Sequence, residues 1–171
     1  MFKRISGELR GYLIDFDLAG LVGHDSHNLD RTGTMPFMAL ELLESVGPGN
    51  APVLHAYAHD AEAVCWVVLW LGVQYAAGRR VGRSFSGWEM VDASTCCMRK
   101  RDAIRKLPRH SFTEPNALLQ MPIRDILTKI RIHYLQKDVK EITGEEVPVM
   151  DVGGWMDDCN KAIVAKVCTA E

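Results

Sequence analysis

A carboxylate pair, Asp15 and Asp17, is the first feature of the sequence that could take part in chemistry. The residues before it, Tyr12 to Ile14, form a short, apolar and β-prone run, which is typical of a buried strand. Asp15 would then emerge where a strand meets a loop, a good position for contact with a ligand. An aspartate there can also begin an Asx turn, and on position alone this structural role is the more common one.

The loop that follows, residues 18–35, carries polar side chains without periodicity. His24, Asp25 and His27 could be taken for a metal site. Metal sites need more ligands and further groups that orient them, so a solvated loop is the better interpretation. Three hydroxyl groups could accept a phosphate that pairs with a nearby arginine such as Arg31: Ser26, Thr32 and Thr34.

Helices must position these residues, because strand signals are few. The apolar spacing predicts a helix over 37–46, which begins after Pro36 and ends in a Gly- and Pro-rich loop. The most apolar stretch, residues 60–77, predicts a central helix that starts near Asp60 and is buried on all sides. Further helices are predicted over 88–106, 123–140 and 156–166.

The predicted fold class is therefore mainly α. Helices pack around the central hydrophobic helix at 60–77, with a short β-strand or hairpin near the N-terminus. A strand of three or four residues is not stable alone, so residues 12–14 need a partner from residues 1–11 or from another chain. The helix at 123–140 should turn one face to the core, made of Ile123, Ile126, Leu127, Ile130 and Tyr134.

Composition excludes several classes of protein. The 171 residues are 47% hydrophobic and 25% charged, as in one ordinary globular domain. The net charge of −2 argues against a nucleic-acid surface, so the basic half of the helix at 88–106 is predicted to be a solvated face. The apolar run at 63–73 is short for a membrane span, although Arg79 and Arg80 keep membrane association open.

The cysteines and the first residues bear on the compartment. The five cysteines form no CxxC pair, and residues 1–10 contain no apolar core of the kind that a secretory signal has. Both features indicate a reducing, intracellular location, cytoplasmic or nuclear.

Three runs together resemble the fungal-type protein kinases. Leu13–Ala19 stands where other protein kinases have Asp-Phe-Gly, and Arg31–Glu41 stands where they have Ala-Pro-Glu. His59–Glu62 then opens an apolar helix. The runs occur in the family's order, and the combination is more specific than any one of them. Beyond Gly78 the resemblance is loose.

The resemblance implies a role for several residues. Asp15 matches the aspartate that holds magnesium against the nucleotide phosphates. Asp17 replaces the usual glycine, as in the fungal-type family, and has less access to positive φ. Thr34 matches the threonine near the turn where substrate docks.

Two more positions carry structural roles in the family. Glu41 matches the glutamate that anchors the activation segment, usually to an arginine further along the chain. Arg99 and Arg101 are the candidates for that arginine here. Asp60 matches the aspartate at the start of the central helix, which is expected to bind backbone amides of the catalytic loop.

For an intact family domain, the resemblance implies ATP-dependent phosphoryl transfer to serine or threonine of a protein substrate, with ATP and Mg as cofactors. Residues 1–14 contain no Gly-rich loop, strand lysine or helix glutamate, and no His-Arg-Asp loop precedes Asp15. Residues 1–171 are therefore predicted to form a single partial kinase-like domain, with an activation segment at 15–41 and C-terminal helices over about 88–166.

This chain alone is predicted to have no catalytic residues and to bind ATP weakly. Its expected partners are a protein substrate and an N-terminal lobe, but neither nucleic acid nor a membrane. Two alternatives remain open. One is a non-catalytic, pseudokinase-like interaction module, and the other is an unrelated helical protein associated with a membrane.

Overall fold

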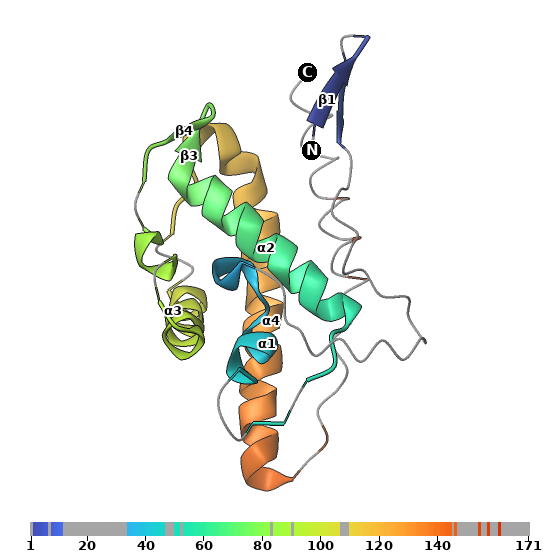
Figure 1. The fold of residues 1–171 in the computed structure, drawn as a ribbon, viewed down its shortest axis with the longest axis vertical. Helices are drawn as coiled ribbons and strands as arrows, with labels where there is room; N and C mark the ends of the chain where they lie inside the picture. The colour runs from blue at the N-terminus through green and yellow to red at the C-terminus, as the bar shows by residue number, and fades with distance from the viewer. Residues whose placement is uncertain are drawn as a thin grey trace. The chain divides into compact units, whose positions relative to one another are not determined.

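The computed structural model divides the chain into two units, Met1–Thr32 and Gly33–Glu171 (Figure 1). The residues that it describes are 2–6, 8–11, 34–46, 50–51, 53–82, 84–89, 91–106, 110–144, 146, 154, 157 and 161. Asp15, Asp17, the polar loop and the predicted strand at 12–14 therefore lie outside the described residues. The prediction of one partial kinase-like domain over the whole chain stays a prediction.

The first unit contains a hairpin. Strands β1 (Phe2–Ile5) and β2 (Glu8–Gly11) pair in antiparallel fashion, with Phe2 opposite Gly11 and Ile5 opposite Glu8. Ser6, in the two-residue connection, has φ 53°, the left-handed backbone that tight hairpin turns require. The predicted hairpin near the N-terminus is confirmed.

The second unit is built mostly of helices, which confirms the mainly α class (Figure 1). In chain order its elements are η1 (Met35–Phe37), α1 (Leu40–Glu44), α2 (Tyr57–Gln74), β3 (Tyr75–Ala76), β4 (Arg79–Arg80), η2 (Ser86–Trp88), α3 (Ala93–Arg105), η4 (Glu114–Asn116) and α4 (Ala117–Thr143). Gly154, Asp157 and Lys161 are also helical, and the other residues of the predicted helix at 156–166 lie outside the described part.

The helix boundaries differ from the predictions for local reasons. The predicted helix at 37–46 is a 3₁₀ turn followed by the short α1. The central helix ends at Gln74 instead of residue 77, because Ala77 and Gly78 (φ 47° and 76°) turn the chain back into β4. α3 begins at Ala93, because the Asp92 side chain accepts a hydrogen bond from Thr95 N and caps the helix.

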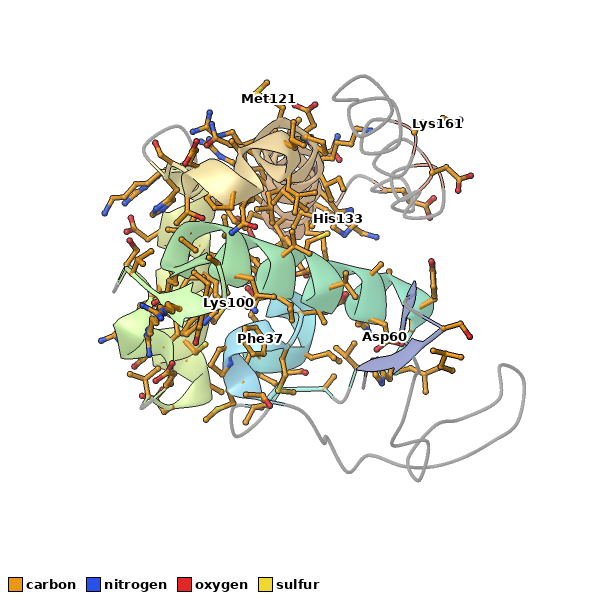
Figure 2. The ribbon with its side chains drawn as sticks, turned by 90° about the horizontal axis from the view of Figure 1, so that it is seen from above. Phe37, Asp60, Lys100, Met121, His133 and Lys161 are labelled. Atoms are coloured by element: carbon orange, nitrogen blue, oxygen red, sulfur yellow. The ribbon has the colours of Figure 1, made fainter. Side chains whose placement is uncertain are left out.

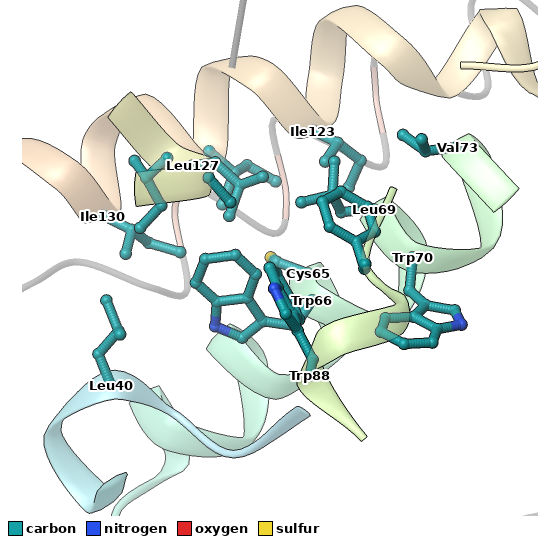
Figure 3. Packing of buried hydrophobic residues seen from close by; sticks show 14 of the residues in the cluster. Leu40, Cys65, Trp66, Leu69, Trp70, Val73, Trp88, Ile123, Leu127 and Ile130 are labelled. Carbon is teal, nitrogen blue, oxygen red and sulfur yellow. The ribbon is translucent and has the colours of Figure 1, made fainter. Parts of the chain in front are cut away.

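The core lies where α2, α3 and α4 meet the segment 37–43. On one side of α2, Leu69 points toward Ile123 and Leu127 of α4 (Figure 3). On another side, the rings of Trp66 and Trp70 lie 5.7 and 5.9 Å from that of Trp88. The central position of α2 is confirmed, and so is the predicted core face of α4. Burial of α2 on all sides is wrong, since Val64 and Leu71 are 49% and 48% exposed.

The hydropathy of the helices bears on the membrane alternative. Among the residues that the structure describes, no helix is long and apolar enough to cross a bilayer.

Candidate functional site

The segment 38–44 is fixed to the helices by polar contacts. Leu40 N, at the start of α1, donates a hydrogen bond of 2.9 Å to Glu62 Oε1 of α2. Glu41 N donates one of 3.0 Å to the hydroxyl oxygen of Tyr134 on α4. Helix N-termini carry amides without partners inside the helix, so these two bonds satisfy groups that burial would otherwise leave unpaired.

Glu62 is the centre of this arrangement. Its carboxylate is 1% exposed and accepts from Leu40 N, from Trp66 Nε1 at 2.9 Å and from the Tyr134 hydroxyl at 2.9 Å. Because Tyr134 donates to Glu62 and accepts from Glu41 N, it links α1, α2 and α4. Burial and the negative charge of Glu62 raise the pKa of Tyr134 well above its usual range, which keeps the hydroxyl proton in place.

Glu41 is held at the edge of the same arrangement. Lys137 Nζ of α4 donates to Glu41 Oε1 at 2.6 Å, and His59 Nε2 lies 3.1 Å from Glu41 Oε2. Burial alone would raise the pKa of Glu41, but the hydrogen bonds from Lys137 and His59 outweigh it and lower the pKa. The carboxylate is therefore ionised at neutral pH and acts as an anchor.

The hydrogen bonds of His59 define its tautomer. His59 Nδ1 accepts a bond of 3.0 Å from Ala56 N, so the ring proton is on Nε2, where it is donated to Glu41. His59 thus connects the start of α2 to α1.

The two arginines proposed from the sequence are not the partners of Glu41. Arg101 instead binds Glu44 Oε1 at 2.6 Å and Asp138 Oδ2 at 3.1 Å. Arg99 donates to the Gly87 carbonyl. Glu44 lies about one helical turn beyond Glu41. Glu44 binds Arg101 of α3, whereas Glu41 binds Lys137 of α4. Lys137 therefore takes the place of the arginine that the resemblance led us to expect.

Lys100 is a residue whose role sequence reasoning missed. The sequence predicts a solvated face here, but the Lys100 side chain is fully buried, and its Nζ lies 4.4 Å from the centre of the Trp66 ring. Its Nζ donates to the Met38 carbonyl, which gives the segment before α1 another attachment. Burial lowers the pKa of Lys100 to about 8, partly opposed by Glu62. The solvated-face prediction is wrong for this residue, although helical spacing places Lys100 on the same face as the buried Cys96, Cys97, Ala103 and Ile104 of α3.

The remaining predicted residues lie apart from this arrangement. Thr34 is exposed, and its carbonyl accepts from Phe37 N at 2.8 Å at the start of η1. Asp60 is exposed in the first turn of α2, where its Oδ1 lies 3.0 Å from His55 Nε2 (Figure 2). Its expected bonds to a catalytic loop remain a prediction. Asp15 lies outside the described residues.

The described residues do not by themselves fit a magnesium–nucleotide site. Within the described part of the chain, no three His, Cys, Asp or Glu side chains are placed to hold a metal ion. Glu41, Glu44 and Glu62 all use their oxygens for bonds to protein groups. The arrangement can hold a segment in place, and we derive no chemical step from it.

We expect the Glu41–Lys137 pair to contribute about 0.5–1 kcal/mol, because both side chains are partly exposed and water screens them. A double-mutant cycle of Glu41→Gln and Lys137→Met, followed by urea unfolding at pH 7, measures this coupling. Glutamine still accepts from His59, so the cycle isolates the ion pair. The coupling should be lost as the pH falls through the lowered pKa of Glu41. The role of Glu41 as an anchor would be contradicted by a coupling energy of zero at pH 7. It would also be contradicted if the coupling energy of Glu41 with Lys137 were no larger than that of Glu41 with the exposed Lys140.

One comparison with known proteins gives a match. Residues 3–72 match the family model described as fungal protein kinase. The matched region contains Asp15, Thr34, Glu41 and Asp60 and ends within α2. The match supports the relationship of this part of the chain to that family. The search of curated proteins and the search of solved structures found no match.

Proposed function

We propose that this chain provides the docking end of the activation segment, and the helices that support it, in a fungal-type protein kinase domain. In the intact domain, phosphoryl groups pass from ATP to serine or threonine of a protein substrate, with Mg as the metal. The observation that carries the proposal is the attachment of Glu41. It lies in the region that matches the family and is bound by Lys137 of α4 and His59 of α2.

A docking segment needs a fixed end. Residues 38–41 are attached through the Met38 carbonyl, Leu40 N, Glu41 N and the Glu41 side chain. These contacts reach α2, α3 and α4, so the segment cannot shift without disturbing the core. Phosphoryl transfer depends mainly on positioning of the reacting groups, and a fixed segment next to Thr34 would help to position a substrate.

Chemistry in this proposal belongs to the intact domain. Asp15 would hold Mg against the phosphates, and the nucleotide-binding lobe would be a partner of the present residues. One carboxylate supplies neither the phosphate clamp nor the base that the reaction needs. We therefore expect residues 1–171 alone to be inactive.

A phosphorylation assay tests this expectation. The purified chain, incubated with radiolabelled ATP, Mg²⁺ and casein, should incorporate no label above the background without protein. The Asp15→Ala variant should give the same result. Incorporation by the wild-type chain that Asp15→Ala abolishes would show that these residues are a kinase by themselves.

A second candidate function is a non-catalytic interaction module. The observation in its favour is a series of exposed apolar side chains on α4, which include Met121 (Figure 2), Ile132, Leu135 and Val139. Sequencing of the transcript and the genomic frame upstream of Met1 distinguishes the two. An open frame that encodes His-Arg-Asp and a strand lysine supports the partial kinase domain, and its absence supports the module.

A further inference from the structure

A hollow lies between η2 and α3, and Glu41 is not among the residues that line it. Its volume is about 510 Å³, within the range of pockets that hold ligands. The aromatic side chains of Phe85 and Trp88 line it, with ring centres 4.6 Å apart. Met98 at its border is 63% exposed. Because Phe85 and Trp88 are only 2% and 4% exposed, they form the inner wall of the hollow, and Met98 supplies most of its accessible apolar surface.

The charged groups of this hollow are mostly cationic. Asp102 is the carboxylate in its lining, and Asp102 Oδ1 and Oδ2 are bound by Arg105 Nη2 at 2.6 Å and by Lys106 Nζ at 2.5 Å. Arg99 donates to the Gly87 carbonyl, an uncharged acceptor, and no described carboxylate lies within ion-pair distance of it. Two cations, Arg99 and Lys106, thus line the hollow with one carboxylate, and Arg105 binds that carboxylate from outside the lining. The net charge of the whole chain is −2.

His110 adds a polar group at this place. Its ring lies 5.2 Å from that of Phe85, and Nε2 is buried with no hydrogen-bond partner among the described residues. Burial, followed by the charge of Arg124, lowers the pKa of His110, so the ring is neutral at physiological pH. Buried polar atoms in native proteins are usually hydrogen-bonded, and an unpaired one beside a hollow favours a ligand with polar groups.

A second hollow of about 310 Å³ lies between α3 and α4. Met98 and Asp102 border both hollows, so the two are adjacent. The second one is lined by Arg105 and by the exposed Arg131 of α4, beside the apolar Leu135. A basic surface that crosses α3 between two hollows suits an extended chain better than a free anion.

We propose that this surface, from Arg99 and Lys106 across Met98 to Arg131, binds an acidic segment of a protein substrate or partner. Carboxylates of the segment would pair with Arg99, Lys106 and Arg131, and an apolar side chain would enter the larger hollow. The inference rests on the proposed docking function and specifies the chemistry of the protein that docks. Charge complementarity selects the occupant, because opposite charges on facing surfaces favour encounter and suppress wrong partners.

Fluorescence anisotropy of the full chain with a labelled acidic peptide that carries one central phenylalanine tests the proposal. Arg99→Glu should weaken binding by about tenfold, because one attraction becomes a repulsion. The matched control is Lys140→Glu at the far end of α4, which changes the net charge equally and should leave binding nearly unchanged. Thermal unfolding of both variants at the wild-type temperature would show that they are folded.

Several outcomes would overturn the proposal. These are no binding of the peptide, equal losses in Arg99→Glu and Lys140→Glu, or equal binding of an acidic peptide without the phenylalanine. Tighter binding of a single-stranded oligonucleotide, lost in Arg99→Glu, would assign the surface to nucleic acid instead. None of these results affects the Glu41 anchor or the phosphorylation assay, so failure here is distinct from failure of the proposed function.

Discussion

Replacement of Glu62 by alanine is expected to lower the free energy of unfolding by about 3–5 kcal/mol, the largest effect that we expect of a single polar substitution among the described residues. The variant leaves three buried donors without their acceptor: Leu40 N, Trp66 Nε1 and the Tyr134 hydroxyl. Each unpaired buried group costs about 1–3 kcal/mol. The same change removes the negative charge that favours the protonated form of the buried Lys100.

The control for this prediction is Glu62→Gln, which has nearly the same shape. Its amide oxygen still accepts from Leu40 N and Trp66 Nε1, but its amide nitrogen cannot accept the Tyr134 proton. We expect an intermediate loss of about 1–3 kcal/mol, measured by urea unfolding at pH 7. If Glu62→Ala lowered the free energy of unfolding no more than Glu62→Gln, the three hydrogen bonds would not hold α1 to the core. The proposal that residues 38–41 form a fixed docking segment would then lose its support.

Hydrophobic periodicity predicted the parts of the fold that depend on one helix at a time. Ile123, Ile126, Leu127, Ile130 and Tyr134 share a face of α4, and all are buried. The central position of α2 followed in the same way from its apolar run. These predictions succeed because burial of a helix face is encoded by spacing within that helix.

Helix ends depend on contacts that spacing does not encode. The sequence predicts a helix that begins at residue 123, directly after Pro122, yet α4 begins at Ala117 and includes this proline. Pro122 is buried, so packing offsets the hydrogen bond that its missing N–H cannot make. Val64 and Leu71 show the opposite case, since their apolar side chains lie on the exposed face of a helix predicted to be wholly buried.

The partners within the candidate site could not be predicted, because they join distant segments. Glu41 and Lys137 are 96 positions apart, and Lys100 and Met38 are 62 apart. The motif around Glu41 predicted that it would be an anchor without indicating which cation binds it. Helical spacing from Cys96, Cys97, Ala103 and Ile104 puts Lys100 on the buried face of α3. Its packing against Trp66 joins two helices, and spacing within one helix does not predict it.

That packing gives Lys100 a measurable pH signature. Burial lowers its pKa to about 8, below the value of 10.5 that an exposed lysine has. Between these two values the unfolded chain holds a proton that the folded chain has released, so stability rises with pH. This contribution should amount to about 2 kcal/mol between about pH 7 and pH 9.5. Below the folded pKa both states are protonated, so Lys100 no longer makes the stability change with pH.

Other buried groups make stability fall as pH rises, so the effect of Lys100 must be measured as the difference in stability between the wild-type chain and a variant without this lysine. Burial raises the pKa of Cys97 to about 11, and the pKa values of Cys96 and Tyr134 are also raised. These acids keep their protons in the folded state, which lowers stability as pH rises through the range where the unfolded chain ionises. The terms are largely shared by the wild-type chain and a Lys100→Met variant, and therefore mostly cancel between the two.

We expect the stability of the wild-type chain, relative to Lys100→Met, to increase by about 2 kcal/mol across this pH range in urea unfolding. Lys140→Met, at an exposed position, should show no such difference. Equal pH slopes for the wild-type chain and Lys100→Met would mean that Lys100 is hydrated in the folded protein. In that case the attachment of the Met38 carbonyl to α3 would be lost, and the docking segment would be held by the Glu62 and Glu41 contacts alone.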